Sequence, residues 1–251
     1  RETVTSGGEN GEDVPLLVGL KALMHNKYWF SVLAMQFCCV LHQVTTLTVG
    51  VYYAKYILND AKLVGNIIMY HHFPALVVML LVPIALDKGA SKRTLAILSG
   101  VSMLLGSLIS LVYASGVPFI ISMGLRGIGF GAFSSVIYGM LADTVEYGEW
   151  KTGVRNDGFQ YAFVSLGNKL GMAIGTSALA GILGALQFVP NQAQNAAVQT
   201  SMHLAFSLIP GVLWLLTAAV LFFYRINKRS YNRIMTELNA KKQFEVIKNC
   251  K

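Results

Sequence analysis

The chain has 251 residues, of which 54% are hydrophobic and 13% are charged, and its formal net charge at pH 7 is +8. A water-soluble domain of this composition would lack the polar surface needed to cover it, so the composition excludes soluble classes and indicates a protein of the lipid bilayer. The three cysteines form neither a CxxC pair nor a disulfide framework, and we expect free thiols.

The first 15 residues are polar, carry four acids and contain no apolar segment of signal-peptide type. Such a segment cannot bury enough surface to fold alone, which predicts a flexible linker. Because residue 1 is arginine rather than methionine, we expect the chain to begin within a longer protein. From Leu16 to Lys27, apolar residues recur at helical spacing beside lysines, as in a helix at the membrane interface. Residues 1–27 are therefore expected to form a linker and an interfacial helix.

Six long apolar runs follow, each near the ~20 residues that cross a hydrocarbon core of ~30 Å. They are Tyr28–Tyr53, Leu63–Leu86, Thr94–Tyr113, Val117–Ala142, Phe159–Val189 and Met202–Tyr224. The runs are continuous rather than alternating, and in lipid only a helix satisfies the backbone of such a run. The sequence predicts an all-α membrane protein, with a six-transmembrane-helix bundle at residues 28–225 and a basic tail at residues 226–251.

Lysine and arginine gather at one set of connections between the runs. This set holds Lys88, Lys92 and Arg93, then Lys151 and Arg155, and then the tail, whereas the opposite connections are nearly free of charge. Positively charged connections face the cytoplasm in membrane proteins. We therefore expect a multi-pass protein of the cell inner membrane with both ends of this chain in the cytoplasm.

The tail Arg225–Lys251 contains eight Lys and Arg and two Glu, a net charge of +6. Its Ile234, Leu238 and Phe244 have the spacing of one apolar helix face. A partner site and attraction to anionic lipid head groups both fit this pattern, and we favour the lipids. Nothing in the sequence indicates a nucleic acid partner.

The stretch Asp143–Gly158 packs six formal charges into 16 residues between two apolar runs. The charged residues are Asp143, Glu146, Glu149, Lys151, Arg155 and Asp157, and three glycines interrupt the stretch. Charges this dense between two segments suited to lipid indicate a functional segment at the membrane face rather than an ordinary surface loop.

Lys169 lies about ten residues into the fifth run, roughly 15 Å from its cytoplasmic start. At that depth we expect the ammonium to face a polar cavity or a carboxylate; a structural lysine paired within the bundle is the alternative. Gly167, Gly171 and Gly175 recur at four-residue spacing and predict a groove where another helix approaches closely. Since Lys169 lies about 200° around the helix from its flanking glycines, it is expected to point away from that groove.

Arg126 lies in the fourth run amid several glycines. Two interpretations are open: its long side chain snorkels outward, or its permanent charge binds an anion such as a substrate carboxylate. His42, His71 and His72 lie in apolar runs with no acidic residue at ligand spacing. We expect buried hydrogen-bonding histidines rather than metal ligands.

None of the twelve acidic residues falls in the middle of an apolar run. A transporter coupled to Na⁺ or H⁺ needs an intramembrane carboxylate or an equivalent oxygen cage, and this chain does not supply one. The sequence shows no nucleophile–base pair and no phosphate loop either, so hydrolase and kinase activities have no support and we expect no enzyme.

Three segments together carry a family resemblance. ADTVEYGEWKTGVRNDG (Ala142–Gly158), followed by NKLGMAIG (Asn168–Gly175), resembles the tenth-to-eleventh helix region of the glycoside-pentoside-hexuronide:cation symporters of the major facilitator superfamily. The first 29 residues resemble the central cytoplasmic loop that enters helix seven, and PIALDKGASKR (Pro83–Arg93) resembles the basic eighth-to-ninth loop. That fold has twelve helices in two halves, so the resemblance implies that this chain is the C-terminal half and that the N-terminal half is its partner.

The resemblance also implies roles for the charged stretch. Asp143, Glu146, Glu149 and Arg155 match the cytoplasmic charges whose ion pairs close the inner gate when such a symporter faces outward. Access, rather than substrate binding, is the expected task of this stretch.

Substrate binding is expected one helix further on. Lys169 matches the family's helix-eleven lysine near the cation and sugar sites, and Ser165 and Asn168 are expected to hydrogen-bond sugar hydroxyls beside it. The resemblance implies symport of a sugar or glycoside, including hexuronides, with Na⁺ or H⁺ by alternating access, without a cofactor and with the cation bound mainly by the N-terminal half. The alternatives are a transporter of lipid or another non-sugar solute and a non-transporting six-helix module.

Overall fold

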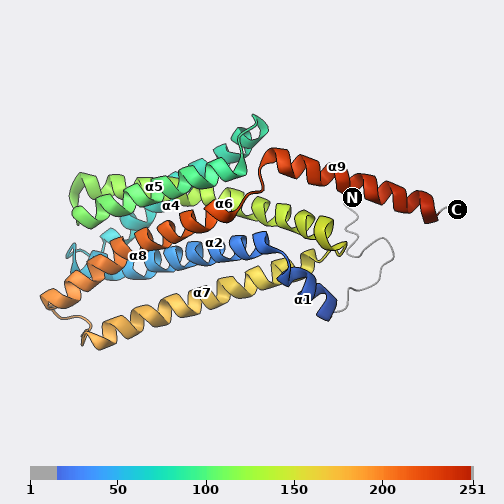
Figure 1. Cartoon of the computed structure of the whole chain (residues 1–251). Coiled ribbons are helices and arrows are strands. Elements are labelled where there is room, and N and C mark those ends of the chain that lie inside the picture. The colour runs from blue at the N-terminus through green and yellow to red at the C-terminus, as the bar shows by residue number, and fades with distance from the viewer. Residues whose placement is uncertain (1–15, 250–251) are drawn as a thin grey trace.

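The computed structural model describes residues 16–249 as a bundle of long helices with short connections and no strand within that range (Figure 1). The elements are α1 (Leu16–Met24), α2 (Lys27–Val44), the π-helical η1 (Thr45–Val49), α3 (Gly50–Tyr56), α4 (Leu63–Asp87), α5 (Lys92–Val112), α6 (Gly116–Thr152), α7 (Asp157–Ala185), α8 (Ala196–Phe223) and α9 (Lys228–Asn249). The linker predicted at residues 1–15 lies outside the described residues, and so does Cys250. Cys38 and Cys39 are free thiols.

The long helices coincide with the six predicted spans, because α2, η1 and α3 form one continuous pass. Among the described residues, five segments are long and apolar enough to cross a membrane: Lys27–Tyr56, α4, α5, α6 and α8. The sixth, α7, has 29 residues but is less apolar, since it carries Asn168 and Lys169 near its middle. The predicted all-α membrane fold is confirmed, and its least apolar pass is the one expected to bind substrate.

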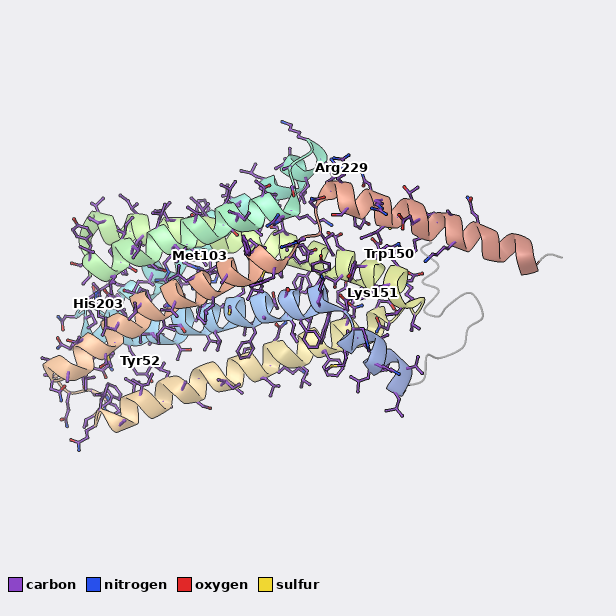
Figure 2. The ribbon with its side chains drawn as sticks, viewed as in Figure 1. Tyr52, Met103, Trp150, Lys151, His203 and Arg229 are labelled. Atoms are coloured by element: carbon purple, nitrogen blue, oxygen red, sulfur yellow. The ribbon has the colours of Figure 1, made fainter. Side chains whose placement is uncertain are left out.

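Successive passes run in opposite directions, so the charged connections meet at one end of the bundle. This end, called the basic end from here on, holds Lys92, Lys151, Arg155 and Lys228, and α9 projects from it (Figures 1 and 2). The opposite end holds the short connections after α3, α5 and α7.

Helix α6 continues ten residues beyond its predicted end at Ala142, as far as Thr152. It stops at Gly153, which has a left-handed φ of +72° and donates its backbone N–H to the carbonyl of Glu149 over 2.8 Å, as a helix C-cap glycine does. Asp157 already begins α7. Most of the charged stretch therefore lies on a rigid helical extension rather than in a loop.

Glycines in the middle of α6 let its backbone approach those of α4 and α5. A Cβ at Gly127 would overlap the carbonyl oxygen of His71, and one at Gly131 would overlap that of Ala75. On the other side, a Cβ at Gly129 would lie 2.6 Å from the carbonyl oxygen of Ser99 in α5. Since only glycine fits where two backbones are this close, α4, α5 and α6 form one tightly packed unit.

The groove predicted from the glycines of α7 is confirmed, and α2 fills it. A Cβ at Gly171 would lie 3.1 Å from Val40 Cγ1, and one at Gly175 would lie 3.0 Å from Val44 Cγ1, while Gly167 faces α2 in the same way. Helix α7 lies along α2 at the flank of the bundle (Figure 1). Much of the rest of its surface is not covered by the described residues.

Helix α9 is anchored on the basic end of α6. Ile234 and Leu238 are buried, as the predicted apolar face requires, whereas the side chain of Phe244 lies outside the described residues. The indole Nε1 of Trp150 in α6 donates to Glu237 Oε2 over 2.8 Å (Figure 2). The tail is thus an ordered helix at its start, held by both apolar and polar contacts.

Candidate functional site

The uncovered side of α7 carries a stripe of polar side chains, Tyr161, Ser165 and Lys169, which we call the α7 polar face. The three residues are four apart, so they lie on neighbouring turns of one side of the helix. All three are exposed, and the ammonium of Lys169 makes no hydrogen bond or ion pair with any described residue. The prediction that Lys169 points away from the glycine groove is confirmed. Tyr161 was missed, although its spacing from Ser165 could have indicated it.

Asn168 lies at the edge of the same face and contacts α2. Its Oδ1 accepts a hydrogen bond of 3.1 Å from Gln36 Nε2, and it is half-buried. The other amide atom of Gln36, Oε1, is buried without a hydrogen-bond partner among the described residues. An amide pair with an unused acceptor beside an unpaired ammonium can bind a ligand that offers both hydroxyl donors and a negative charge.

Arg126 does not join this face. It is completely buried, with Nη2 donating to Thr46 Oγ1 over 2.9 Å and Nη1 donating to the carbonyl of Phe206 over 3.2 Å. Its guanidinium also lies 4.8 Å from the centre of the Phe206 ring. The interpretation that Arg126 snorkels outward is wrong, because the π-helical η1 and α8 supply polar groups that let the charge stay inside.

The histidines extend this buried polar cluster. Thr46 Oγ1 lies 3.5 Å from His42 Nε2, which lies 3.4 Å from His71 Nε2, and His72 Nδ1 lies 3.4 Å from His71 Nδ1. His42 and His71 are fully buried, and His72 also contacts the carbonyl of Ile68. Residues 16–249 contain no group of three or more side chains placed to hold a metal ion. The hydrogen-bonding contacts expected of these histidines are confirmed.

The gate charges form ion pairs within this chain. Lys92 Nζ donates to Asp143 Oδ1 over 2.6 Å, which joins the start of α5 to α6. Arg155 Nη1 donates to Glu149 Oε2 over 2.9 Å, and its Nε lies 3.6 Å from Asp157 Oδ2. Partial burial lowers the pKa of Arg155, but the two acids together raise that pKa by more than burial lowers it. The net shift of the Arg155 pKa is therefore upward. The chain therefore balances most of these charges itself.

Glu146, the remaining gate acid, faces α9. Its Oε2 is buried without a hydrogen-bond partner among the described residues. The hydroxyl of Tyr231 in α9 interacts with the same carboxylate, and burial, then this contact and the nearby Asp143, raise the pKa of that hydroxyl. Glu146 is thus an acid with spare bonding capacity at the basic end.

A network of neutral amides, missed by the sequence reasoning, lies beside the charges. Asn26 Nδ2 donates to the carbonyl of Thr144 over 2.7 Å, and Thr144 Oγ1 donates to Gln160 Oε1 over 3.0 Å. Gln160 Nε2 donates to Asn156 Oδ1 over 2.9 Å, and Asn156 Nδ2 donates to the carbonyl of Gly19 over 3.0 Å. The network is buried and joins α1, α2, α6 and α7. No sequence motif marks it, because its members are far apart along the chain.

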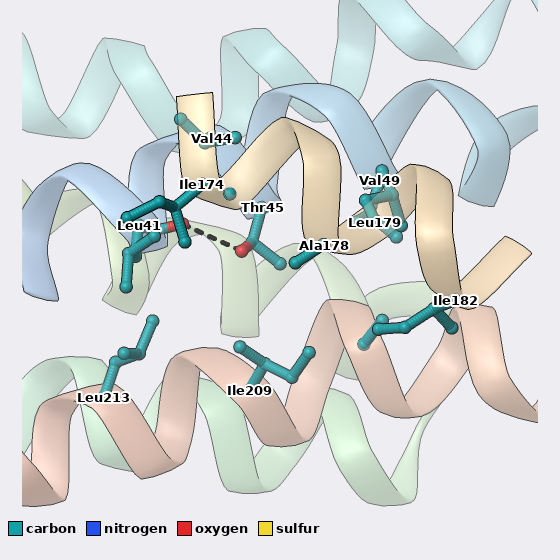
Figure 3. A pocket seen from close by; sticks show the side chains of 12 residues that line it. Leu41, Val44, Thr45, Val49, Ile174, Ala178, Leu179, Ile182, Ile209 and Leu213 are labelled. Atoms are coloured by element: carbon teal, nitrogen blue, oxygen red, sulfur yellow. Dashed lines mark hydrogen bonds between the residues drawn. The ribbon is translucent and has the colours of Figure 1, made fainter. Parts of the chain in front are cut away.

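An apolar pocket of about 170 Å³ lies between α2, η1, α7 and α8 (Figure 3). Aliphatic side chains such as Val44, Ile174 and Ile209 line it. The hydroxyl of Thr45 donates to the carbonyl of Leu41 over 2.8 Å and has no proton left to donate to a ligand. This pocket cannot recognise a polar solute, so the α7 polar face remains the candidate binding surface.

Comparison with known proteins agrees with this arrangement. Residues 5–228 match the family model described as MFS/sugar transport protein. The chain belongs to this family. It is 34% identical over 230 residues to the isoprimeverose transporter of Lactiplantibacillus pentosus, covering 88% of this chain and 46% of that protein. It is 29% identical over 234 residues to the glucuronide carrier protein homolog of Escherichia coli K12, covering 92% of this chain and 51% of that protein.

Membership confirms the resemblance to sugar and glycoside transporters of the major facilitator superfamily and the multi-pass membrane fold. These relatives are transporters rather than enzymes. The chain spans about half the length of the curated relatives it matches. The matched family thus agrees with the half-fold expected from the sequence.

Proposed function

We propose that this chain is the C-terminal half of a secondary active transporter that carries a sugar or glycoside, including hexuronides, with Na⁺ or H⁺ by alternating access. The observation that carries the proposal is the α7 polar face: an uncovered stripe on a spanning helix whose Lys169 has no counter-charge among the described residues. An unpaired ammonium facing lipid would be costly, so it belongs in a water-filled pathway.

In this proposal Lys169 binds the charged part of the solute, and Ser165 and Asn168 hydrogen-bond its hydroxyl groups. One relative is named a glucuronide carrier protein homolog, which supports an anionic sugar, since a glucuronide carries a carboxylate. Arg126, the other candidate for this carboxylate, is enclosed by η1 and α8. Its proposed role is therefore to hold the π-helical η1 in place rather than to bind solute directly.

The coupling cation is proposed to bind mainly in the N-terminal half. The acidic residues described here lie near helix ends or in connections, for example Asp87 and Asp143, and none lies in the middle of a spanning helix. A cation site needs several oxygen ligands within the membrane, and these would have to come from a partner half.

The basic end is proposed to face the cytoplasm of the cell inner membrane and to act as the inner gate. Asp143, Glu149 and Arg155 form ion pairs within the chain here, and Glu146 Oε2 has no hydrogen-bond partner among the described residues. These residues would exchange partners with the N-terminal half when the pathway closes. Pairs near the surface are worth only ~0–1 kcal/mol each, which suits a gate that must open and close.

The test is uptake into membrane vesicles that contain the full polypeptide carrying this chain. We expect uptake of a glucuronide that rises when a Na⁺ or H⁺ gradient is imposed. Replacing Lys169 by Gln should weaken uptake of the glucuronide about 10- to 100-fold, because a charge-assisted hydrogen bond is lost. The matched control is Lys62→Gln, which removes a cation at the opposite end and should change uptake less than about twofold.

Three outcomes would count against the proposal. Absence of uptake for neutral and charged glycosides under both gradients would favour a non-transporting module or a different solute. Uptake that ignores both gradients would exclude symport. Equal loss of glucuronide and neutral glycoside uptake in Lys169→Gln would remove the role of this residue in recognising a negative charge.

A further inference from the structure

A second polar site lies at the basic end, apart from the α7 polar face. A cavity of about 230 Å³ opens between the connection from α4 to α5, the end of α6 and the start of α9. Its charged lining residues are Lys92, Arg93, Lys228 and Asp143, so three cations face one acid.

The single acid of the cavity, Asp143, is already in an ion pair. Asp143 accepts from Lys92 over 2.6 Å, which leaves Arg93 and Lys228 without a counter-charge. Neither side chain makes a hydrogen bond or ion pair with any side chain that the structure describes. The Nε atom of Arg93 is moreover buried with no hydrogen-bond partner. A buried guanidinium nitrogen without an acceptor is costly, which indicates an anionic ligand at this position.

An apolar groove begins at the same arginine. It has a volume of about 170 Å³, lies between α5 and α8, and runs from Arg93 past Ala96 and Gly100 to Leu104. Eleven residues of helix separate its ends, which makes it roughly 16 Å long. This length is about half of a ~30 Å hydrocarbon core, the depth of one leaflet. No side chain fills the groove at Gly100, where an added Cβ would meet nothing within 4 Å.

The surroundings of the groove are suited to lipid. Ile97 of α5 and Phe222 of α8, both on its walls, are 45% and 68% exposed and lie on membrane-spanning segments. A soluble phosphate compound would use the cations and leave the groove empty. An anionic phospholipid would occupy both the cavity and the groove. Its phosphate is covalently linked to its acyl chains, and the cavity and the groove likewise meet at Arg93.

We propose that the cavity and the groove together bind one anionic phospholipid of the leaflet at the basic end. Its phosphate is bound by Arg93 and Lys228, and one acyl chain lies in the groove between α5 and α8. The guanidinium can form a bidentate contact with phosphate oxygens, which a lysine cannot do, so Arg93 is the principal ligand.

The test is native mass spectrometry of the full polypeptide that contains this chain, released from detergent after titration with defined lipids. We expect phosphatidylglycerol to be retained at one site in preference to phosphatidylcholine. Arg93→Gln and Lys228→Gln should each weaken that retention about fivefold or more. Gly100→Leu should weaken it as well, because the leucine side chain fills the groove without removing a charge.

Arg229→Gln is the matched control, since Arg229 lies next to Lys228 on α9 but does not line the cavity (Figure 2). The Arg229→Gln variant should retain phosphatidylglycerol as well as the unmodified protein does. Equal losses in Arg93→Gln and Arg229→Gln would overturn the proposal, because general attraction to the basic tail would then explain the binding. Displacement of phosphatidylglycerol by glycerol 3-phosphate, or an unchanged affinity in Gly100→Leu, would overturn it in favour of a soluble phosphate compound.

Discussion

Lys92 and Asp143 form an ion pair whose two ends differ in burial, and this difference can be tested. The Asp143 side chain is 9% exposed, whereas the Lys92 side chain is 35% exposed. Removing Lys92 leaves a buried carboxylate without its partner. Removing Asp143 leaves an ammonium that can turn toward water and that still has the carbonyl of Gly139 within 3.1 Å.

The expected magnitudes follow from these exposures. Breaking a fully buried pair from one side costs ~3–5 kcal/mol, and an exposed pair is worth ~0–1 kcal/mol. Because Asp143 is close to the buried limit, Lys92→Gln should destabilise the protein by ~2–3 kcal/mol. Asp143→Asn should cost ~1–2 kcal/mol, since the stranded Lys92 is solvated and the asparagine oxygen remains an acceptor.

The assay is equilibrium unfolding in detergent of both single variants and of the double variant. The double variant should be less destabilised than the sum of the single changes, by ~1–2 kcal/mol, as expected for residues in contact. Lys88→Gln, an exposed cation in the same connection, should change stability by less than ~0.5 kcal/mol. Additive single effects, or a larger cost for Asp143→Asn than for Lys92→Gln, would refute the reasoning.

Three further predictions concern packing, the tail and the gate. Gly127→Ala should destabilise the protein by ~1–3 kcal/mol, because the added Cβ meets the backbone of α4. Gly124→Ala on the same helix places its Cβ in open space and should be neutral or stabilising. Equal unfolding midpoints for the two variants would contradict this prediction. The pKa of Glu237 is lowered by its hydrogen bond and ion pair with Arg233 in α9 and by its hydrogen bond from the Trp150 indole. The contact between α9 and α6 should therefore be complete above the unfolded pKa of about 4.5 and be lost as the pH falls through the lower folded pKa. Indole fluorescence should follow this change, and Glu237→Gln should abolish it. Arg155→Ala should lower transport turnover more than substrate affinity, and unchanged turnover would exclude it from the gate.

The long helices could be predicted from run length and hydropathy, and five of them are apolar enough to cross a membrane, whereas α7 is less apolar than the others. The packing of α7 was also predictable, since Gly167, Gly171 and Gly175 repeat on one helix side and glycine grooves recruit neighbouring helices. Helix ends were less predictable. The extension of α6 through the charged stretch to Thr152 was missed because charged residues end an apolar run without ending a helix.

Contacts between distant segments could not be read from the sequence. Arg126 was left between two interpretations because its partners, Thr46 and the carbonyl of Phe206, each lie 80 residues away along the chain. The π-helical turn that brings Thr46 to the guanidinium has no clear sequence signal. The internal pair of Asp143 with Lys92 was missed for the same reason, because the two residues lie 51 positions apart along the chain.

The glycine contacts limit how the gate can move. Gly127 and Gly131 place the backbone of α6 directly against carbonyl oxygens of α4, so sliding of α6 along α4 would meet immovable atoms. From Glu149 to Thr152 the charged end of α6 is continuous helix without proline or glycine, so this last turn offers no hinge either. Helix α7 differs, because its glycines contact side chains of α2, such as Val40, rather than backbone atoms. Opening at the basic end should therefore move α4, α5 and α6 as one rigid body, with any adjustment confined to α7. Cross-linking α7 to α2 should then slow transport, whereas cross-linking α6 to α4 should leave it intact; the reverse result would contradict the rigid-body argument.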